Sequence, residues 1–263
     1  MVTLAAIFPP TQPPEQIGAV AAAAESAGLE QLWIWEDCFK ESGIATATAM
    51  LATTSRITVG IGLLPVPLRN VALTAMEIAT LSRLFPGRLI AGVGHGVLDW
   101  MGQAGARAES PMTLLREYTA ALYALLHGET VTTRGRYVNL DAVALDWPPA
   151  MAPPLLVGGI RPRTVSLAGE LADGVIIPGG VSPEEVRTSV GQLHGQRSAG
   201  RGPADVVVFI STPAGRPAAA VAATVSEYAA AGATHVAVNA AEDDADLERF
   251  VGFLAREVGP LLR

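Results

Sequence analysis

The chain has 263 residues, of which 50% are hydrophobic and 16% charged, so a disordered protein is excluded and a large core is possible. Its formal net charge of −7 is spread along the chain, which argues against nucleic acid as a partner. No apolar run reaches the roughly 18 residues of a membrane span, and the single cysteine, Cys38, excludes an internal disulfide. The first residues read as a strand and not as a signal peptide, and a reducing cytoplasmic setting fits best.

Taken in order, the apolar residues predict strands that alternate with helices along the whole chain. The first unit is a strand at 2–8, a proline turn at 9–14 and a helix that ends at Ala27, with Gly28 as its C-cap. Further strands are expected at 31–35, 57–63, 88–93, 155–157, 174–177, 206–210 and 235–238, and further helices at 44–55, 71–85, 112–127, 163–171, 183–199, 217–231 and 244–262.

Three connections depart from this alternation. Residues 94–111 show little regular pattern and are expected to form a loop. Residues 129–147 alternate apolar and polar side chains around Arg134–Gly135, which predicts a β-hairpin excursion. Residues 148–154 are a proline-rich connector.

Eight strands alternating with eight helices imply parallel strands joined by crossover helices. Eight such units in about 250 residues predict an α/β fold, a closed (β/α)₈ TIM barrel, with a doubly wound open sheet as the alternative. No linker or low-complexity tract divides the chain, so a single domain over 1–263 is expected. A barrel would place the functional site at the carboxyl ends of its strands.

Two apolar strands carry glycines near those ends. They are R-I-T-V-G-I-G-L-L-P at 56–65 and R-L-I-A-G-V-G-H-G at 88–96. Glycine lets a flat ligand approach the backbone closely. The second stretch is a weak match to the dinucleotide fingerprint, since the third glycine and the later carboxylate are missing.

The candidate site consists of the residues that end or follow five of the strands. Glycine pairs at 158–159 and 179–180 open onto helices, where free N–H groups can hold a phosphate, although tight turns alone would also explain them. Late barrel strands often carry the phosphate site, which favours 158–161. The candidate residues are Asp37, Cys38, Gly62, Leu63, Leu64, Pro65, Gly94, His95, Gly96, Val97, Gly158, Gly159, Ile160, Arg161, Pro178, Gly179 and Gly180.

Two of these residues are candidates for catalysis. His95 is either a reactive side chain or a hydrogen-bonded structural histidine. Asp37 either orients a polar group, takes a proton or caps a turn. Cys38 has no base near it in the sequence and is expected to line the pocket wall. The histidines show no ligand spacing, so no metal is expected.

Several longer motifs together resemble the luciferase-like flavin oxidoreductases, most of all their deazaflavin (coenzyme F420) branch. They are A-G-L-E-Q-L-W-I-W-E-D (27–37), T-S-R-I-T-V-G-I-G-L-L-P (54–65), A-T-L-S-R-L-F-P-G-R-L-I-A-G-V-G-H-G (79–96), G-E-T-V-T-T-R-G-R-Y (128–137), P-P-L-L-V-G-G-I-R-P (153–162) and A-G-E-L-A-D-G-V-I (168–176). The resemblance implies a deazaflavin or flavin at the barrel mouth and a cis Gly62–Leu63 peptide that bulges against its ring. It also implies that residues 158–161 hold the coenzyme phosphate, with 179–180 nearby.

The chain departs from the sugar-phosphate dehydrogenases of that branch at three positions. Cys38, Val97 and Val181 stand where those enzymes have a histidine, a glutamate and a phosphate-gripping lysine. A sugar phosphate is therefore not the expected substrate. The region after the seventh strand is also short, which suggests an open site or one completed by the partner in a possible homodimer.

The resemblance implies hydride transfer between coenzyme F420 and a small organic substrate such as an enone, imine or alcohol. The proton would come from His95, Asp37, water or the substrate itself. An FMN-dependent monooxygenase is the first alternative, because similar residues would hold its flavin ring. A coenzyme-binding protein without catalysis is the second alternative, because the family's histidine and glutamate are missing.

Overall fold

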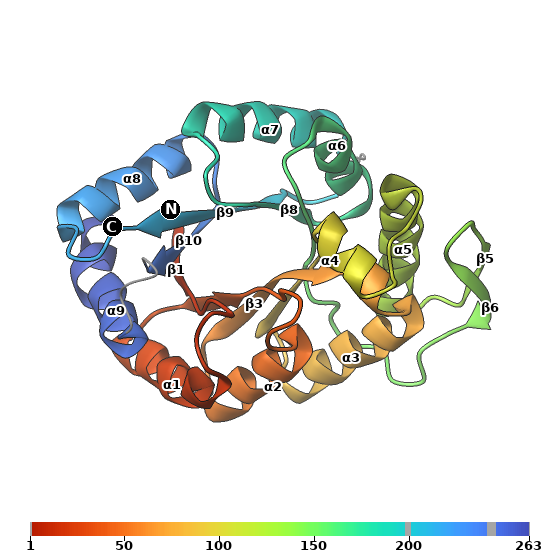
Figure 1. Cartoon of the computed structure of the whole chain (residues 1–263), viewed down its shortest axis with the longest axis horizontal. Helices are drawn as coiled ribbons and strands as arrows, with labels where there is room; N and C mark the ends of the chain where they lie inside the picture. Colours follow the sequence, from red (N-terminus) through yellow and green to blue (C-terminus); the bar gives the residue numbers. More distant parts are fainter. Residues whose placement is uncertain (1, 198–200, 241–245, 263) are drawn as a thin grey trace.

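The predicted barrel is confirmed by a computed structural model, which describes residues 2–197, 201–240 and 246–262 (Figure 1). Parallel strands close in the order β1-β10-β9-β8-β7-β4-β3-β2, and this closure excludes the open doubly wound sheet. The barrel strands are β1 (Thr3–Ile7), β2 (Gln31–Ile34), β3 (Thr58–Pro65), β4 (Leu89–Gly94), β7 (Leu155–Gly158), β8 (Gly174–Ile177), β9 (Asp205–Thr212) and β10 (His235–Ala240).

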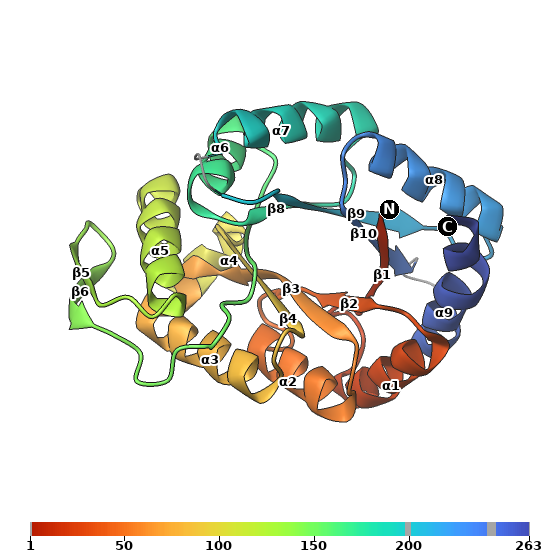
Figure 2. The ribbon, with the colours of Figure 1, turned by 180° about the vertical axis from the view of Figure 1, so that it is seen from behind.

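Helices surround the barrel, as Figures 1 and 2 show from opposite sides. They are α1 (Ile17–Ala27), α2 (Gly43–Thr53), α3 (Val71–Leu84), α4 (Leu98–Gln103), α5 (Pro111–Leu126), α6 (Pro162–Leu171), α7 (Pro183–Gly195), α8 (Ala218–Ala230) and α9 (Leu247–Phe253). Short 3₁₀ turns lie at Pro14–Gln16 and Val66–Leu68, and α9 continues through a π turn at Leu254–Val258 and a 3₁₀ turn at Gly259–Leu262. Of the predicted helix ends, residues 198–199 and 244–245 lie outside the described residues.

The predicted hairpin excursion is also confirmed. Strands β5 (Val131–Arg134) and β6 (Asn139–Val143) pair antiparallel outside the barrel. The Glu117 carboxylate on α5 accepts hydrogen bonds from the N–H groups of Arg136, Tyr137 and Val138 at 2.9, 2.8 and 3.0 Å. The hairpin is therefore anchored to α5 through its turn and the start of its returning strand.

The expected loop at 94–111 is corrected in one part, because it contains the short helix α4. Only Met101 of this helix is buried, so the six residues carry no apolar stripe that would announce a helix. Gly96 precedes α4 with φ +68°, and a side chain there would meet Pro65 and Met101. This segment thus packs against the end of β3.

Apolar side chains fill the barrel on both faces of its sheet, as expected for parallel strands. A large outer cluster lies between strands and helices. A smaller inner cluster contains Ala5, Ile7, Trp33, Ile90, Leu156, Ile176, Val207, Phe209 and Ala237. Within it the Trp33 and Phe209 rings meet edge to face with centroids 5.7 Å apart. Among the described residues, no helix is long and apolar enough to cross a membrane.

Candidate functional site

The glycines of β3, β4 and β7 make room for side chains of the protein itself. A Cβ on Gly62 would lie 2.7 Å from Cζ of Phe209, which reaches across from the opposite strand β9. A Cβ on Gly94 or on Gly158 would overlap Cδ2 of Leu63. A ligand at the mouth would therefore meet the half-buried Leu63 side chain before it reached the backbone of Gly94 and Gly158.

The end of β3 has the conformation that the family resemblance implies. The Gly62–Leu63 peptide bond is cis, and the pairing of β3 with β4 shifts register between Ile61 and Leu64. A second cis bond, Cys38–Phe39, lies after β2 and had no signal in the sequence. Leu64 and Pro65 continue the strand, with both side chains buried.

The turn from β7 into α6 adjoins the Leu63 side chain. Gly159 has φ +153°, and a Cβ there would lie 2.7 Å from Cγ2 of Thr164. The Gly159 N–H already donates to the Ile176 carbonyl at 2.9 Å, so it is not available to a phosphate. The N–H groups of Ile160 and Arg161 have no acceptor among the described residues, and no side chain caps α6.

The second turn predicted to hold a phosphate, at 178–180, leads into a helix whose start is capped, unlike that of α6. Gly180 has φ +86° and open space around it. Helix α7, however, begins with a complete capping box, in which Ser182 and Glu185 bond each other's backbone N–H groups at 2.8 and 3.3 Å. Of the two predicted turns, the one before α6 is thus the better match to an anion.

His95 is held between the starts of α5 and α6. Its Nε2 lies 3.4 Å from Oγ1 of Thr164. Burial lowers the pKa of His95, although the nearby Pro111 carbonyl raises it, so the ring is neutral at pH 7. Its Nδ1 is buried without a well-aligned partner among the described residues. The contact with Thr164 holds the His95 ring, while its Nδ1 has no aligned partner among the described residues.

The loop after β2 carries Asp37 and Cys38. The Asp37 carbonyl accepts the Lys40 N–H at 2.9 Å, which closes a turn as the sequence suggested. Burial and the Glu36 and Asp37 carboxylates raise the pKa of the Cys38 thiol. Cys38 is therefore a neutral thiol at pH 7, which fits a wall residue better than a nucleophile.

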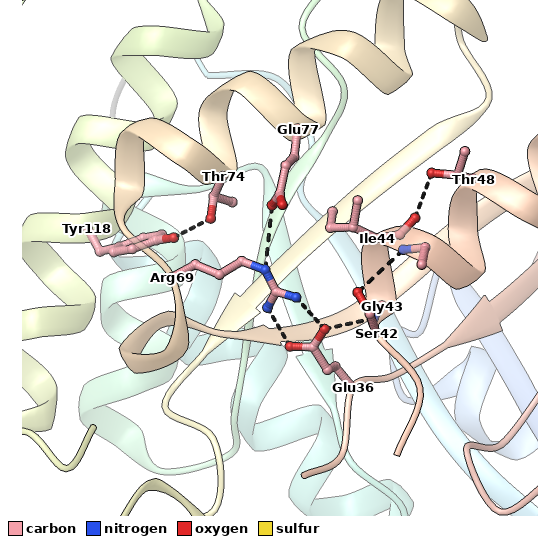
Figure 3. A network of polar contacts seen from close by, with 10 residues as sticks. Glu36, Ser42, Gly43, Ile44, Thr48, Arg69, Thr74, Glu77 and Tyr118 are labelled. Carbon is pink, nitrogen blue, oxygen red and sulfur yellow. Dashed lines mark hydrogen bonds and ion pairs between the residues drawn. The ribbon is translucent and has the colours of Figure 1, made fainter. Parts of the chain in front are cut away.

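Glu36 and Arg69 fix this loop to the next one, and sequence reasoning missed both residues (Figure 3). The Arg69 guanidinium donates from Nη1 to Oε1 of Glu36 at 2.5 Å and from Nη2 to Oε2 at 2.6 Å. The Gly43 N–H donates to the same Oε2 at 2.7 Å, and Glu77 Oε2 lies 3.5 Å from Arg69 Nε. The backbone N–H of Glu36 donates to the Leu63 carbonyl at 3.2 Å, so the network reaches the Leu63 backbone.

Val97 and Val181, two of the three residues that depart from the sugar-phosphate dehydrogenases, differ in how far they are exposed to solvent. Val97 is exposed on the loop that leads into α4. Val181 is buried, and its carbonyl accepts the Tyr228 hydroxyl at 2.7 Å. Neither valine offers a charge to a substrate phosphate.

A cavity of about 600 Å³ lies beside this site, between the loops that follow β1 and β2. Pro10, Thr11, Pro13, Lys40, Glu41 and Ser42 are among the residues that line it. None of the predicted site residues does so. We therefore place the site at Leu63, His95 and the start of α6, where the groups with useful chemistry meet.

The opposite side of the mouth carries polar residues that sequence reasoning also missed. Ser211 and Asn239 are paired neighbours near the ends of β9 and β10. Ser211 comes two residues after Phe209, and Asn239 two residues after Ala237. Phe209 and Ala237 point into the barrel, and side chains alternate along a strand, so Ser211 and Asn239 also point inward. No local pattern distinguished them, since three apolar residues precede Ser211 in V-F-I-S at 208–211.

Comparison with known proteins gives a reductase and a dehydrogenase as relatives, the second of which is F420-dependent by name. The 5,10-methylenetetrahydromethanopterin reductase of Methanolobus tindarius is 32% identical over 202 residues, which make up 76% of this chain and 61% of that protein. The F420-dependent glucose-6-phosphate dehydrogenase of Nakamurella multipartita is 30% identical over 185 residues, 65% of this chain and 54% of that protein. The chain thus spans less than two thirds of the length of these curated relatives.

A solved structure and a family model cover nearly the whole chain. The structure of the F420-dependent tetrahydromethanopterin reductase from Methanopyrus kandleri matches with a TM-score of 0.86 at 20% identity, covering 100% of this chain and 99% of that one. This likeness shows a shared fold. The family model described as luciferase-like monooxygenase matches residues 2–257. The chain therefore belongs to the luciferase-like monooxygenase family.

Proposed function

We propose that the protein, acting as a single domain over 1–263, transfers a hydride between coenzyme F420 and a small organic substrate. The substrate is an enone, an imine or an alcohol. The proposal rests on one observation: an apolar side chain that could support the coenzyme ring lies next to a helix start that could bind its phosphate. Leu63 lies over Gly158, and the uncapped start of α6 follows within three residues.

The residues present fit the parts of such a coenzyme. The free N–H groups of Ile160 and Arg161 and the start of α6 suit its phosphate. The exposed side chains of Arg161 and Arg163 add positive charge there. The Leu63 side chain presents an apolar surface for one face of the ring.

When bound, the coenzyme supplies a ring carbon that accepts or gives a hydride while the substrate oxygen or nitrogen loses or gains a proton. Leu63 supports the ring, and the Glu36–Arg69 pair keeps the loops after β2 and β3 in place around it. His95, neutral and held by Thr164, and Asp37 are the protein groups that handle the proton.

A coenzyme titration tests the proposal. The purified protein is titrated with coenzyme F420, followed by its fluorescence, and separately with FMN. We expect F420 to bind at least about 10-fold more tightly than FMN, a difference of about 1.4 kcal/mol. Binding of FMN alone would contradict the proposal and favour a monooxygenase. F420 binding without turnover of enones, imines and alcohols would favour a coenzyme-binding protein without catalysis.

A further inference from the structure

The side of the barrel mouth opposite Leu63 carries the uncharged polar residues Ser211 and Asn239. In the closed strand order β9 is four strands from β3 in either direction, and β10 is four strands from β4. Phe209 shows this directly, because its ring reaches Gly62 across the interior. Ser211 stands one inward position above Phe209 and pairs with Asn239 on β10.

The side chains of Ser211 and Asn239 differ in their exposure to solvent and in their hydrogen bonds. Ser211 is exposed although its neighbours Ile210 and Thr212 are buried, so the mouth is open at this point. Oδ1 of Asn239 is buried and accepts no hydrogen bond from the described residues. A buried amide oxygen without a donor costs about 1–3 kcal/mol, which a hydroxyl or N–H donor would offset.

Among the residues that the structure describes, which stop at Ala240 on β10 and resume at Asp246, the inward positions around this pair carry no charge. The last inward residues of β3, β4 and β7 are Gly62, Gly94 and Gly158, and those of β9 and β10 are Ser211 and Asn239. Below them lie the Trp35 and Phe209 rings, with centroids 6.1 Å apart. An aromatic floor and neutral hydrogen-bonding groups suit an uncharged ligand, since a phosphate or carboxylate would be desolvated here without a counter-charge.

We propose that Ser211 and Asn239 bind the reacting oxygen of an uncharged alcohol, with the Asn239 carbonyl accepting its O–H and the Ser211 hydroxyl donating to it. When the alcohol carbon gives its hydride to the coenzyme, the O–H proton passes to water at the open mouth beside Ser211, because an amide carbonyl cannot take it. The inference rests on the proposed function and narrows its substrate from enone, imine or alcohol to a neutral alcohol and the matching ketone. An enone and its saturated ketone have no O–H or N–H to give to Asn239, an imine is paired with an amine that is charged near pH 7, and anionic substrates lack a partner at these positions. Both residues determine specificity and leave coenzyme binding to the opposite side of the mouth.

The experiment uses the whole chain loaded with coenzyme F420. Oxidation of 2-propanol and cyclohexanol is compared with that of lactate and glucose 6-phosphate. We expect turnover of the neutral alcohols. The Asn239→Leu and Ser211→Ala variants should lose at least about 10-fold in kcat/KM, mainly through KM, because each leaves a substrate hydroxyl without its partner.

A binding measurement accompanies the kinetics. Cyclohexanone added to the loaded protein should perturb the absorbance of the bound coenzyme in the unaltered protein and in Thr212→Val, a control whose side chain points outward on the same strand. The perturbation should weaken at least about 10-fold in Ser211→Ala, which removes the donor to the ketone oxygen, and should change little in Asn239→Leu, because a ketone has no O–H to give to Asn239; coenzyme affinity should be unchanged in both. Since Ser211 is exposed, Ser211→Ala keeps the test valid if Asn239→Leu does not fold.

Three outcomes would overturn the inference. They are unchanged KM and ketone affinity in both variants, a preference for lactate or glucose 6-phosphate, and failure of the loaded protein to bind or oxidise any neutral alcohol. In each case tight F420 binding together with turnover of an enone, an imine or another alcohol would leave the proposed function standing. Absence of F420 binding in the unaltered protein would overturn both proposals together.

Discussion

Arg69 and Glu36, 33 positions apart in the chain, form a two-pronged ion pair at the barrel mouth (Figure 3). Their side chains are only 15% and 7% exposed. The hydrogen bonds to Glu36 raise the pKa of Arg69, although burial opposes this. The pair connects the loop after β2 with the loop after β3, so it bears on both the fold and the mouth.

Replacing Arg69 should lower the free energy of unfolding more than replacing an arginine of an exposed ion pair. Arg69→Met leaves the Glu36 carboxylate buried with only the Gly43 N–H as a partner, and we expect a loss of about 3 kcal/mol in the free energy of unfolding. Arg116→Met is the matched control. It breaks a similarly two-pronged pair with Glu170, whose side chains are 49% and 45% exposed, and should cost less than about 1 kcal/mol. Urea unfolding measures both, and equal losses would contradict the difference in burial.

The Leu63 side chain fills the space that a side chain at position 158 would need. We therefore expect that a loss of stability caused by a change at Gly158 can be relieved by a second change at Leu63. Gly158→Ala forces Leu63 to move, and we expect a loss of about 1–3 kcal/mol in stability together with weaker coenzyme binding. Leu63→Ala in the same chain should remove the clash, so the two changes should be strongly non-additive in a double-mutant cycle. Gly191→Ala on α7, which has open space, is the control and should stabilise the protein by about 0.5–1 kcal/mol. Additive losses would show that Leu63 does not occupy this position.

The hydrogen bonds of the Glu25 carboxylate should make a contribution to stability that depends on pH. Burial alone would raise its pKa, but hydrogen bonds from the N–H groups of Arg56, Ile57 and Ser55 and from the Ser55 hydroxyl lower it to about 2. A pKa below the unfolded value means that the contribution is complete above about 4.5 and is lost as the pH falls toward 2. Because Glu25 is only half-buried, solvent screens its contacts, and Glu25→Gln should cost only about 1 kcal/mol at pH 7. The difference from the unaltered protein should shrink steadily in unfolding curves taken from pH 5 to pH 2, and a constant difference would contradict this origin.

Local pattern was enough to predict the barrel, the hairpin and the mouth. The strands that became β3 and β4 are buried runs with β-branched residues, and their signal does not depend on distant contacts. Helix α4 escaped prediction because six residues with one buried side chain have no detectable period. The cis bond at Gly62–Leu63 was expected only from the family resemblance, whereas the bond at Cys38–Phe39 was not expected at all.

The contacts that give the site its character join distant parts of the chain. Leu63 over Gly158 and Arg69 at Glu36 depend on which strands become neighbours and in which register, and no local pattern contains that information. Ser211 and Asn239 needed the same knowledge, since each looks like an ordinary polar residue at a strand end. His95 was noticed, but it lies in the loop after β4 and its partner Thr164 lies on α6, far along the chain.

The uncapped start of α6 gives a prediction in which stability and binding change in opposite directions. Arg161 is the N-cap residue of α6, and no side chain caps this helix. Arg161→Asp should place a carboxylate on the N–H of Arg163 or Thr164 and stabilise the protein by about 1 kcal/mol. If the coenzyme phosphate binds there, the same carboxylate competes with it, and coenzyme affinity should fall at least about 10-fold.

Two controls separate capping from charge. Arg187→Asp makes the same change in charge at an exposed position on α7 and should leave coenzyme affinity nearly unchanged. Arg161→Ala removes the positive charge without adding a cap, so its affinity should lie between those of the unaltered protein and Arg161→Asp. Thermal unfolding without coenzyme and fluorescence titration with it provide the two measurements. A more stable Arg161→Asp protein that binds the coenzyme as before would show that the phosphate lies elsewhere, because the N–H groups of α6 would then be occupied by the new carboxylate.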